Sequence, residues 1–221
     1  MKNFLSIAFK FLILSITLFG LYLTISDAVN VLEVLSYFTS FVNLLTALLY
    51  TIFLLNQIFR TQRSNWIHFF KQTLIVFLSL TTIVYSFVLI PYIADHQIAY
   101  QIFSLKDIFI HFAVPFLVVL DYAFFDKKGR LKNFYIGGNL FTLSTYVFYL
   151  FTYINLGGRF HLNGGETIYP YFFLDVQTLG FETFAWVATA ILLVVFLLSW
   201  VVFKIDQILG IPLDLNQTKR K

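Results

Sequence analysis

Residues 36–55 read SYFTSFVNLLTALLYTIFLL and indicate the fold class of the whole chain. A helix needs about 20 mostly apolar residues to cross the hydrocarbon core of a bilayer, and this uncharged stretch has that length. Its first part nevertheless carries Ser36, Thr39, Ser40 and Asn43. Polar groups within a membrane are costly, so we expect these side chains to face the interior of a helical bundle or a wet cavity.

The composition of the chain is that of an integral membrane protein. Among its 221 residues, 59% are apolar and only 12% are charged, whereas soluble domains carry about a quarter charged residues. We expect one bundle over residues 1–210 and a short polar tail over residues 211–221. The absence of cysteine excludes disulfides, thiolate metal sites and cysteine nucleophiles. The small, dispersed net charge of +4 gives no sign of a nucleic-acid partner.

Apolar segments of spanning length predict an all-α protein with six transmembrane helices. The predicted spans cover residues 5–25, 36–57, 72–93, 107–125, 135–155 and 180–203. The first resembles a signal peptide but lacks a small-x-small cleavage site, so we expect it to be retained. With this map, 13 of the 15 basic residues lie on one side, and only Lys106 and Arg159 lie on the other. The positive-inside rule then predicts cytoplasmic termini.

The same map brings two reactive side chains to one depth. At about 1.5 Å per residue, Thr39 lies roughly 5 Å below the outer end of its span. His111 is equally far into the span that begins at residue 107, and Asn43 shares a helix face with Thr39. A threonine hydroxyl becomes a nucleophile when a base such as histidine removes its proton. Thr39 and His111 would therefore be the minimum for acyl transfer from a lipid ester, without any cofactor.

Further polar residues are predicted near this layer, and other roles remain open for all of them. Asp175, Tyr171 and Glu182 are tentative substrate or oxyanion ligands, together with Asn43. Threonine and asparagine in membrane helices also bond backbone carbonyls or join helices, which would suit a lipid or small-molecule binder, a transporter or a structural subunit. The absence of an inverted repeat counts against transport. Protein partners stay unknown.

Histidine and proline positions complete the prediction for the outer layer. His96, His111 and His161 lack the spacing of a metal-binding motif, so no metal site is expected. Pro115 should kink its helix and free the backbone carbonyl four residues earlier, as should Pro91. Asp121 is expected at the inner helix end, near the lysines at positions 127 and 128.

Three segments, SYFTSFVNLL, HFAVPFLVVLDYAFFDKKGRL and YPYFFLDVQTLGFETF, resemble in this order a bacterial six-helix family known as Pr-six-Pr membrane proteins. That family looks distantly similar to the eukaryotic androgen-induced membrane hydrolases, which cleave fatty acid esters of hydroxy fatty acids with a threonine and a histidine. The resemblance implies that Thr39 is the nucleophile and His111 its base. It also implies membrane lipids as partners and a lipid ester as substrate.

Overall fold

Long helices make up most of the computed structural model, which describes residues 2–26, 28, 30–59, 65–96, 98, 100–162 and 165–211. The helices are α1 (Lys2–Ser26), α2 (Val31–Ser36), α3 (Phe38–Ile58), α4 (Asn65–Val84), α5 (Ile90–Asp95), α6 (Leu105–Ile108), α7 (Val114–Phe125), α8 (Tyr135–Asn155) and α9 (Val176–Gly210). Shorter elements are the π-helical segments η1 (Tyr85–Leu89) and η2 (Phe109–Ala113), the 3-10 turn η3 (Phe172–Leu174) and strands β1 (Phe160–Leu162) and β2 (Gly165–Thr167). The all-α class is confirmed apart from this one small hairpin.

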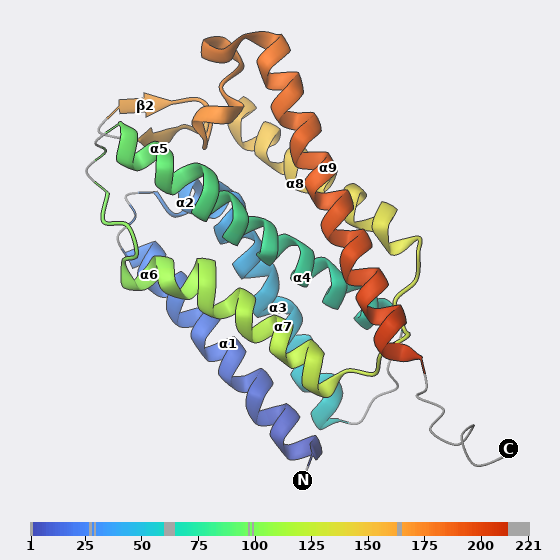
Figure 1. Cartoon of the computed structure of the whole chain (residues 1–221). Helices are drawn as coiled ribbons and strands as arrows, with labels where there is room; N and C mark the ends of the chain where they lie inside the picture. Colours follow the sequence, from blue (N-terminus) through green and yellow to red (C-terminus); the bar gives the residue numbers. More distant parts are fainter. Residues whose placement is uncertain are drawn as a thin grey trace, which may run out of the picture.

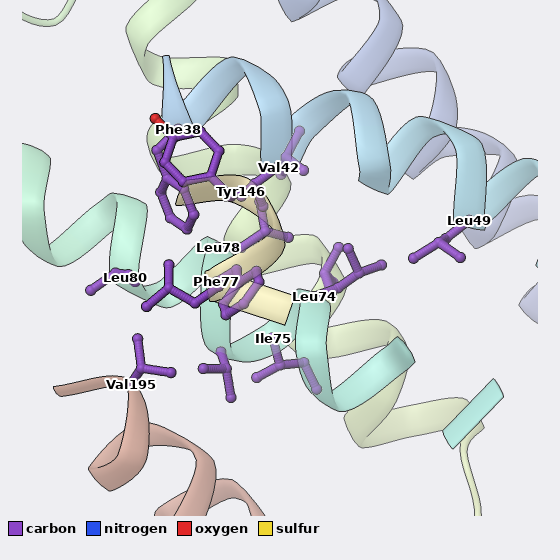
Figure 2. Close-up of a cluster of buried hydrophobic side chains, with 14 of the residues drawn as sticks. Phe38, Val42, Leu49, Leu74, Ile75, Phe77, Leu78, Leu80, Tyr146 and Val195 are labelled. Atoms are coloured by element: carbon purple, nitrogen blue, oxygen red, sulfur yellow. The ribbon is translucent and has the colours of Figure 1, made fainter. Parts of the chain in front are cut away.

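Helix α4 occupies the centre of the bundle. It packs against α3 and α7 on one side and against α8 and α9 on the other (Figure 1). Its side chains Phe77 and Leu78 are almost fully buried and meet Phe38 and Val42 of α3 and Tyr146 of α8 (Figure 2). The start of α1 and the end of α9 lie toward one end of the bundle, and the β1–β2 hairpin lies at the other (Figure 1).

Five helical segments among the described residues are long and apolar enough to cross a membrane: 3–26, 38–58, 66–95, 105–125 and 176–210. The chain is therefore a multi-pass membrane protein. Helix α8 has the predicted bounds of 135–155 but does not belong to this group. Its glycine, asparagine, threonine and tyrosine residues lower its apolar character, although Phe141 and Phe148 are exposed on its surface.

Two helices extend beyond the spans predicted for them. Helix α4 begins at Asn65 and not at residue 72, and α9 runs from Val176 to Gly210 and not over 180–203. In both cases the helix includes charged residues that lie outside the predicted span. Lys71 of α4 is only 2% exposed and Asp206 of α9 is fully buried, because each has polar partners inside the bundle. The predicted tail lies outside the described residues from position 212 onward.

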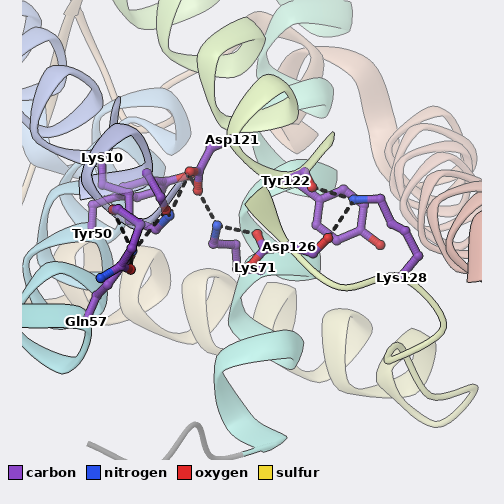
Figure 3. Close-up of polar contacts among 10 residues, drawn as sticks. Lys10, Tyr50, Gln57, Lys71, Asp121, Tyr122, Asp126 and Lys128 are labelled. Carbon is purple, nitrogen blue, oxygen red and sulfur yellow. Dashed lines mark hydrogen bonds and ion pairs between the residues drawn. The ribbon is translucent and has the colours of Figure 1, made fainter. Parts of the chain in front are cut away.

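A buried ionic network, which sequence analysis missed, joins α1, α3, α4 and α7 (Figure 3). Asp121 accepts hydrogen bonds from Lys10 at 2.8 Å and from Tyr50 at 3.0 Å, and it is also paired with Lys71. Lys71 in turn reaches Asp126 at 2.5 Å. Asp121 therefore pairs with lysines of α1 and α4, which lie far from it in the sequence. Charges inside a membrane bundle are tolerated when they are paired in this way.

The segment between α8 and α9 covers the end of the bundle opposite the start of α1 and the end of α9 (Figure 1). Strands β1 and β2 pair antiparallel, with Phe160 opposite Thr167. The ring of Phe160 is fully buried and lies 5.2 Å from the ring of Tyr37, between centroids. Farther along, Phe172 stacks on Tyr92 at 3.6 Å. These contacts pack the aromatic loop on the bundle.

Candidate functional site

Two π-helical segments meet at the predicted polar layer. Each lies just before a proline, η1 before Pro91 and η2 before Pro115. Proline has no N–H for the carbonyl four residues earlier, and for Pro115 that carbonyl belongs to His111. It accepts a hydrogen bond from the hydroxyl of Thr82 at 2.6 Å. The predicted freed carbonyl is thus confirmed, in a kind of helical distortion that is frequent at functional sites.

The imidazole of His111 is buried against a tyrosine. His111 is 6% exposed, and its ring stacks on Tyr85 of η1 with centroids 4.0 Å apart and planes at 13°. The Thr81 backbone is a hydrogen-bonding neighbour of the ring, whereas the buried Nδ1 atom has no partner among the described residues. In a neutral imidazole one nitrogen donates and the other accepts. The unpartnered Nδ1 can therefore serve as the acceptor that a general base requires.

Polar residues that sequence analysis missed hold this tyrosine and the start of α6. The hydroxyl of Tyr85 accepts a hydrogen bond from the Phe103 N–H at 3.3 Å. Asp107, 1% exposed, accepts from Tyr100 at 2.5 Å and forms a capping box with Ser104. The Ser-x-x-Asp spacing at residues 104–107 is a sequence signal for such a cap. The Asp107 carboxylate is therefore used to cap the start of α6.

Asn43 links the helix of Thr39 to the segment of His111. It is fully buried, and its Nδ2 donates to the carbonyl of Thr39 at 2.9 Å and to that of Ile110 at 3.2 Å. Both amide hydrogens are therefore engaged by backbone oxygens, so the tentative oxyanion role of Asn43 is not supported. The bond to Ile110 instead fixes Thr39 and His111 at one level of the bundle. The Oδ1 atom of Asn43 is buried without a partner in the described part of the chain.

Tyr171 extends from the aromatic loop to the start of α3, where Thr39 lies 8% exposed. Its hydroxyl accepts a hydrogen bond from the Phe38 N–H at 3.1 Å, and it also has hydrogen-bonding contacts with the backbone and side chain of Thr39. Burial raises the pKa of Tyr171 to about 12, and the hydrogen bonds from Phe38 and Thr39 oppose that rise. The phenol is therefore protonated at neutral pH and keeps a proton to donate beside Thr39.

The two tentative carboxylates do not join this group. Asp175 caps α9 by accepting from Gln177 N–H at 3.0 Å and from Thr178, and the hydrogen bond from the Thr178 side chain lowers the pKa of Asp175. Glu182 is exposed on α9, just after Gly180 with its positive φ of 77°. The first carboxylate is used by a helix cap and the second is exposed, and the tentative roles of both stay predictions.

The two other histidines that were predicted to lie on the outer side, His96 and His161, have other neighbours. His96 stacks on Tyr92 at 4.1 Å, and His161 pairs with Glu33 at 2.8 Å. Within the described ranges, no group of three or more His, Cys, Asp or Glu side chains could hold a metal ion. The assembled candidate site consists of Thr39, Asn43, Tyr85, His111 and Tyr171.

Comparison with known proteins gave no match. No family model matches the chain, no curated protein matches it, and no solved structure matches it. Function lives in the chemistry of a site rather than in a fold. The function of this chain must therefore follow from the five side chains of the candidate site.

Proposed function

We propose that the chain crosses a bacterial plasma membrane six times and hydrolyses a lipid ester at its outer layer. As a sixth span, α8 has 21 residues, which at about 1.5 Å each approach the roughly 30 Å of a hydrocarbon core. An even number of spans agrees with the common end of the bundle at which α1 starts and α9 ends. Lys10 and Lys71 are buried in the bundle and no longer count as exposed basic residues of one side. The other 11 of the 13 basic residues assigned to that side still favour cytoplasmic termini.

One observation carries the enzymatic proposal: a buried imidazole with an unpartnered Nδ1 lies at the level of a buried threonine on the adjacent helix. Buried polar atoms in proteins nearly always have hydrogen-bond partners, so an exception requires an explanation. The explanation is that His111 acts as a base, and its Nδ1 accepts a proton from Thr39 or from water. We expect the Thr39 hydroxyl to approach within hydrogen-bond reach of Nδ1 when substrate is bound, since such contacts are often loose in a free enzyme.

The proposed reaction has two halves. In the first, His111 takes the Thr39 proton, Oγ1 attacks the ester carbonyl carbon, and the alcohol departs with the proton from His111. In the second, His111 takes a proton from water, the resulting hydroxide attacks the acyl-threonine, and the carboxylic acid leaves as Thr39 is reprotonated. Tyr171 donates a hydrogen bond to the oxyanion of each tetrahedral intermediate. Asn43 keeps the two helices in register.

A second candidate function is lipid binding without chemistry. The unpartnered atoms Asn43 Oδ1 and His111 Nδ1 are both buried acceptors, and a ligand hydroxyl could donate to either. A binder needs the same polar layer, but it does not need a nucleophile. The two functions therefore differ in what the Thr39 hydroxyl contributes.

Hydrolysis of long-chain ester probes by purified protein tests the proposal. We expect Thr39→Ala to abolish turnover while lipid binding persists, and His111→Ala to be as damaging as the double variant. Thr51→Ala is the matched control on the same helix, because the Thr51 hydroxyl only donates to the Ala47 carbonyl at 2.8 Å. Wild-type protein that binds lipid but turns over no ester of any chain length would favour the binder.

A further inference from the structure

The connection between α7 and α8 is held in one conformation by a buried carboxylate of α9. Asp206 accepts hydrogen bonds from the Tyr122 hydroxyl, from Gly129 N–H at 3.0 Å and from Leu131 N–H at 2.8 Å. Gly129 has a φ of +72°, and a Cβ on Gly210 would come within 2.5 Å of the Gly129 backbone. The loop between α7 and α8 and the end of α9 therefore form a surface of fixed conformation, at the end of the bundle where α1 begins (Figure 1).

This surface presents basic side chains outward. Lys127, Arg130 and Lys132 of the loop are exposed, as is Lys204 of α9. The Gln207 side chain, one turn after Lys204, donates to the Leu131 carbonyl at 3.0 Å and so joins the two basic segments. The single acid of loop residues 126–134 is Asp126, whose carboxylate is paired with Lys71 at 2.5 Å (Figure 3). The exposed cations are thus presented beside an acid whose charge is already paired.

Apolar side chains flank these cations. The ring of Phe134 is 69% exposed and lies 5.8 Å from the Lys132 ammonium; Trp200, 44% exposed, lies 5.7 Å from that of Lys204. Ile208 continues the apolar surface toward the end of α9. Tryptophan and basic residues combine in this way at the headgroup level of a membrane. A free phosphate ion would use the cations only, whereas a phospholipid would use both parts of the surface.

We propose that this surface, formed by Lys127, Arg130, Lys132 and Lys204, binds the headgroup of an anionic phospholipid whose acyl chains lie along Phe134 and Trp200. Basic surfaces between helices on the cytoplasmic side commonly recognise anionic headgroups. The Asp206 hydrogen bonds order the loop before the lipid arrives, so binding does not have to order it. This lipid occupies the end of the bundle opposite the candidate hydrolytic site, and the proposal is independent of that activity.

Native mass spectrometry of the purified full-length protein tests the proposal with phosphatidylglycerol and phosphatidylcholine as paired probes. The triple variant Lys127→Gln/Arg130→Gln/Lys132→Gln should lose affinity for phosphatidylglycerol on the order of 10- to 100-fold, since each cation contributes to binding an anionic lipid. Lys219→Gln/Arg220→Gln/Lys221→Gln removes the same charge from the tail and should keep most of the affinity. Equal losses in both triples, or none in the first, would overturn the proposal.

A substitution at Asp206 separates an ordered surface from general electrostatic attraction. Asp206→Asn makes the protein more positive, yet we expect it to weaken phosphatidylglycerol binding because the loop loses its anchor. Tyr122→Phe removes one hydrogen bond to the same carboxylate and should weaken binding less; it serves as the test if Asp206→Asn does not fold. Unchanged or tighter binding in the folded variant, or displacement of the lipid by inorganic phosphate at equal concentration, would contradict the proposed lipid site.

Discussion

The ring of Tyr85 lies flat on the imidazole of His111, with centroids 4.0 Å apart and an interplanar angle of 13°. Each residue belongs to a π-helical segment, and each segment lies just before a proline. The two distortions thus bring one buried aromatic pair together. This stack fixes the plane of the ring that would act as the base.

Substitution of Tyr85 tests whether the stack positions the histidine. Tyr85→Phe keeps the ring and loses the hydroxyl that accepts from Phe103 N–H, so it should cost about 1 kcal/mol of stability and leave most ester turnover. Tyr85→Ala removes the ring, should cost about 3–5 kcal/mol and should reduce kcat sharply. Thermal unfolding in micelles and probe hydrolysis give the two readouts. Equal kcat values for both variants would show that the stack does not position His111.

Tyr171 should act in the chemical step. Because its hydroxyl lies beside Thr39 and its raised pKa of about 12 keeps it protonated, Tyr171→Phe should lower kcat by roughly 10²–10³ and change KM little. Tyr149→Phe is the control, since that hydroxyl contacts Ser36 at 3.1 Å instead. A change in KM alone would assign Tyr171 to substrate binding.

The buried ionic network should be sensitive to the loss of a single charge. Lys71→Met leaves Asp126 without this cation and Asp121 with Lys10 alone, so unfolding should become easier by about 3–5 kcal/mol. Lys132→Met, at an exposed position, should change stability by no more than about 0.5 kcal/mol. Chemical denaturation in micelles free of anionic lipid measures both. Similar stability of the two variants would argue against the network.

Docking of the hairpin should depend on pH through His161. Its hydrogen bond and charge interaction with Glu33 raise the pKa of His161 above 6.5. The contact therefore stabilises the hairpin fully below the unfolded pKa, and this contribution is lost as pH rises through the raised value. Hydrogen exchange at the His161 amide, which donates to Glu33 at 2.6 Å, should show less protection at high pH after correction for intrinsic rates. Glu33→Gln should remove that pH dependence, and a persisting dependence would assign it to another group.

Local sequence was sufficient to predict the features that depend on the length of an apolar segment and on the rise per residue of a helix. These two quantities predict the bounds of α8. They also predict that Thr39 and Asn43 lie at the same level of the bundle as the segment of His111. Pro115 likewise predicted the freed carbonyl of His111, because a missing N–H is a property of one residue.

Long-range pairing explains what sequence analysis missed. Lys10 and Lys71 were counted among the 13 basic residues on one side of the membrane, since their partner Asp121 lies 111 and 50 positions away in the sequence. Asp175 and Glu182 were placed by depth alone, which does not say whether a carboxylate is used by a helix cap or faces outward. The Asn-Gly-Gly sequence at residues 163–165 was a usable hairpin signal.

The central claim is that Thr39 forms a covalent acyl intermediate with His111 as its base. The most direct measurement is mass spectrometry of protein quenched during turnover of a long-chain ester, followed by mapping of the modified peptide. We predict one acyl group on Thr39 in wild-type protein, and no acylation in Thr39→Ala or His111→Ala. Hydrolysis that proceeds without acylated Thr39, or acylation that persists in Thr39→Ala, would contradict the account.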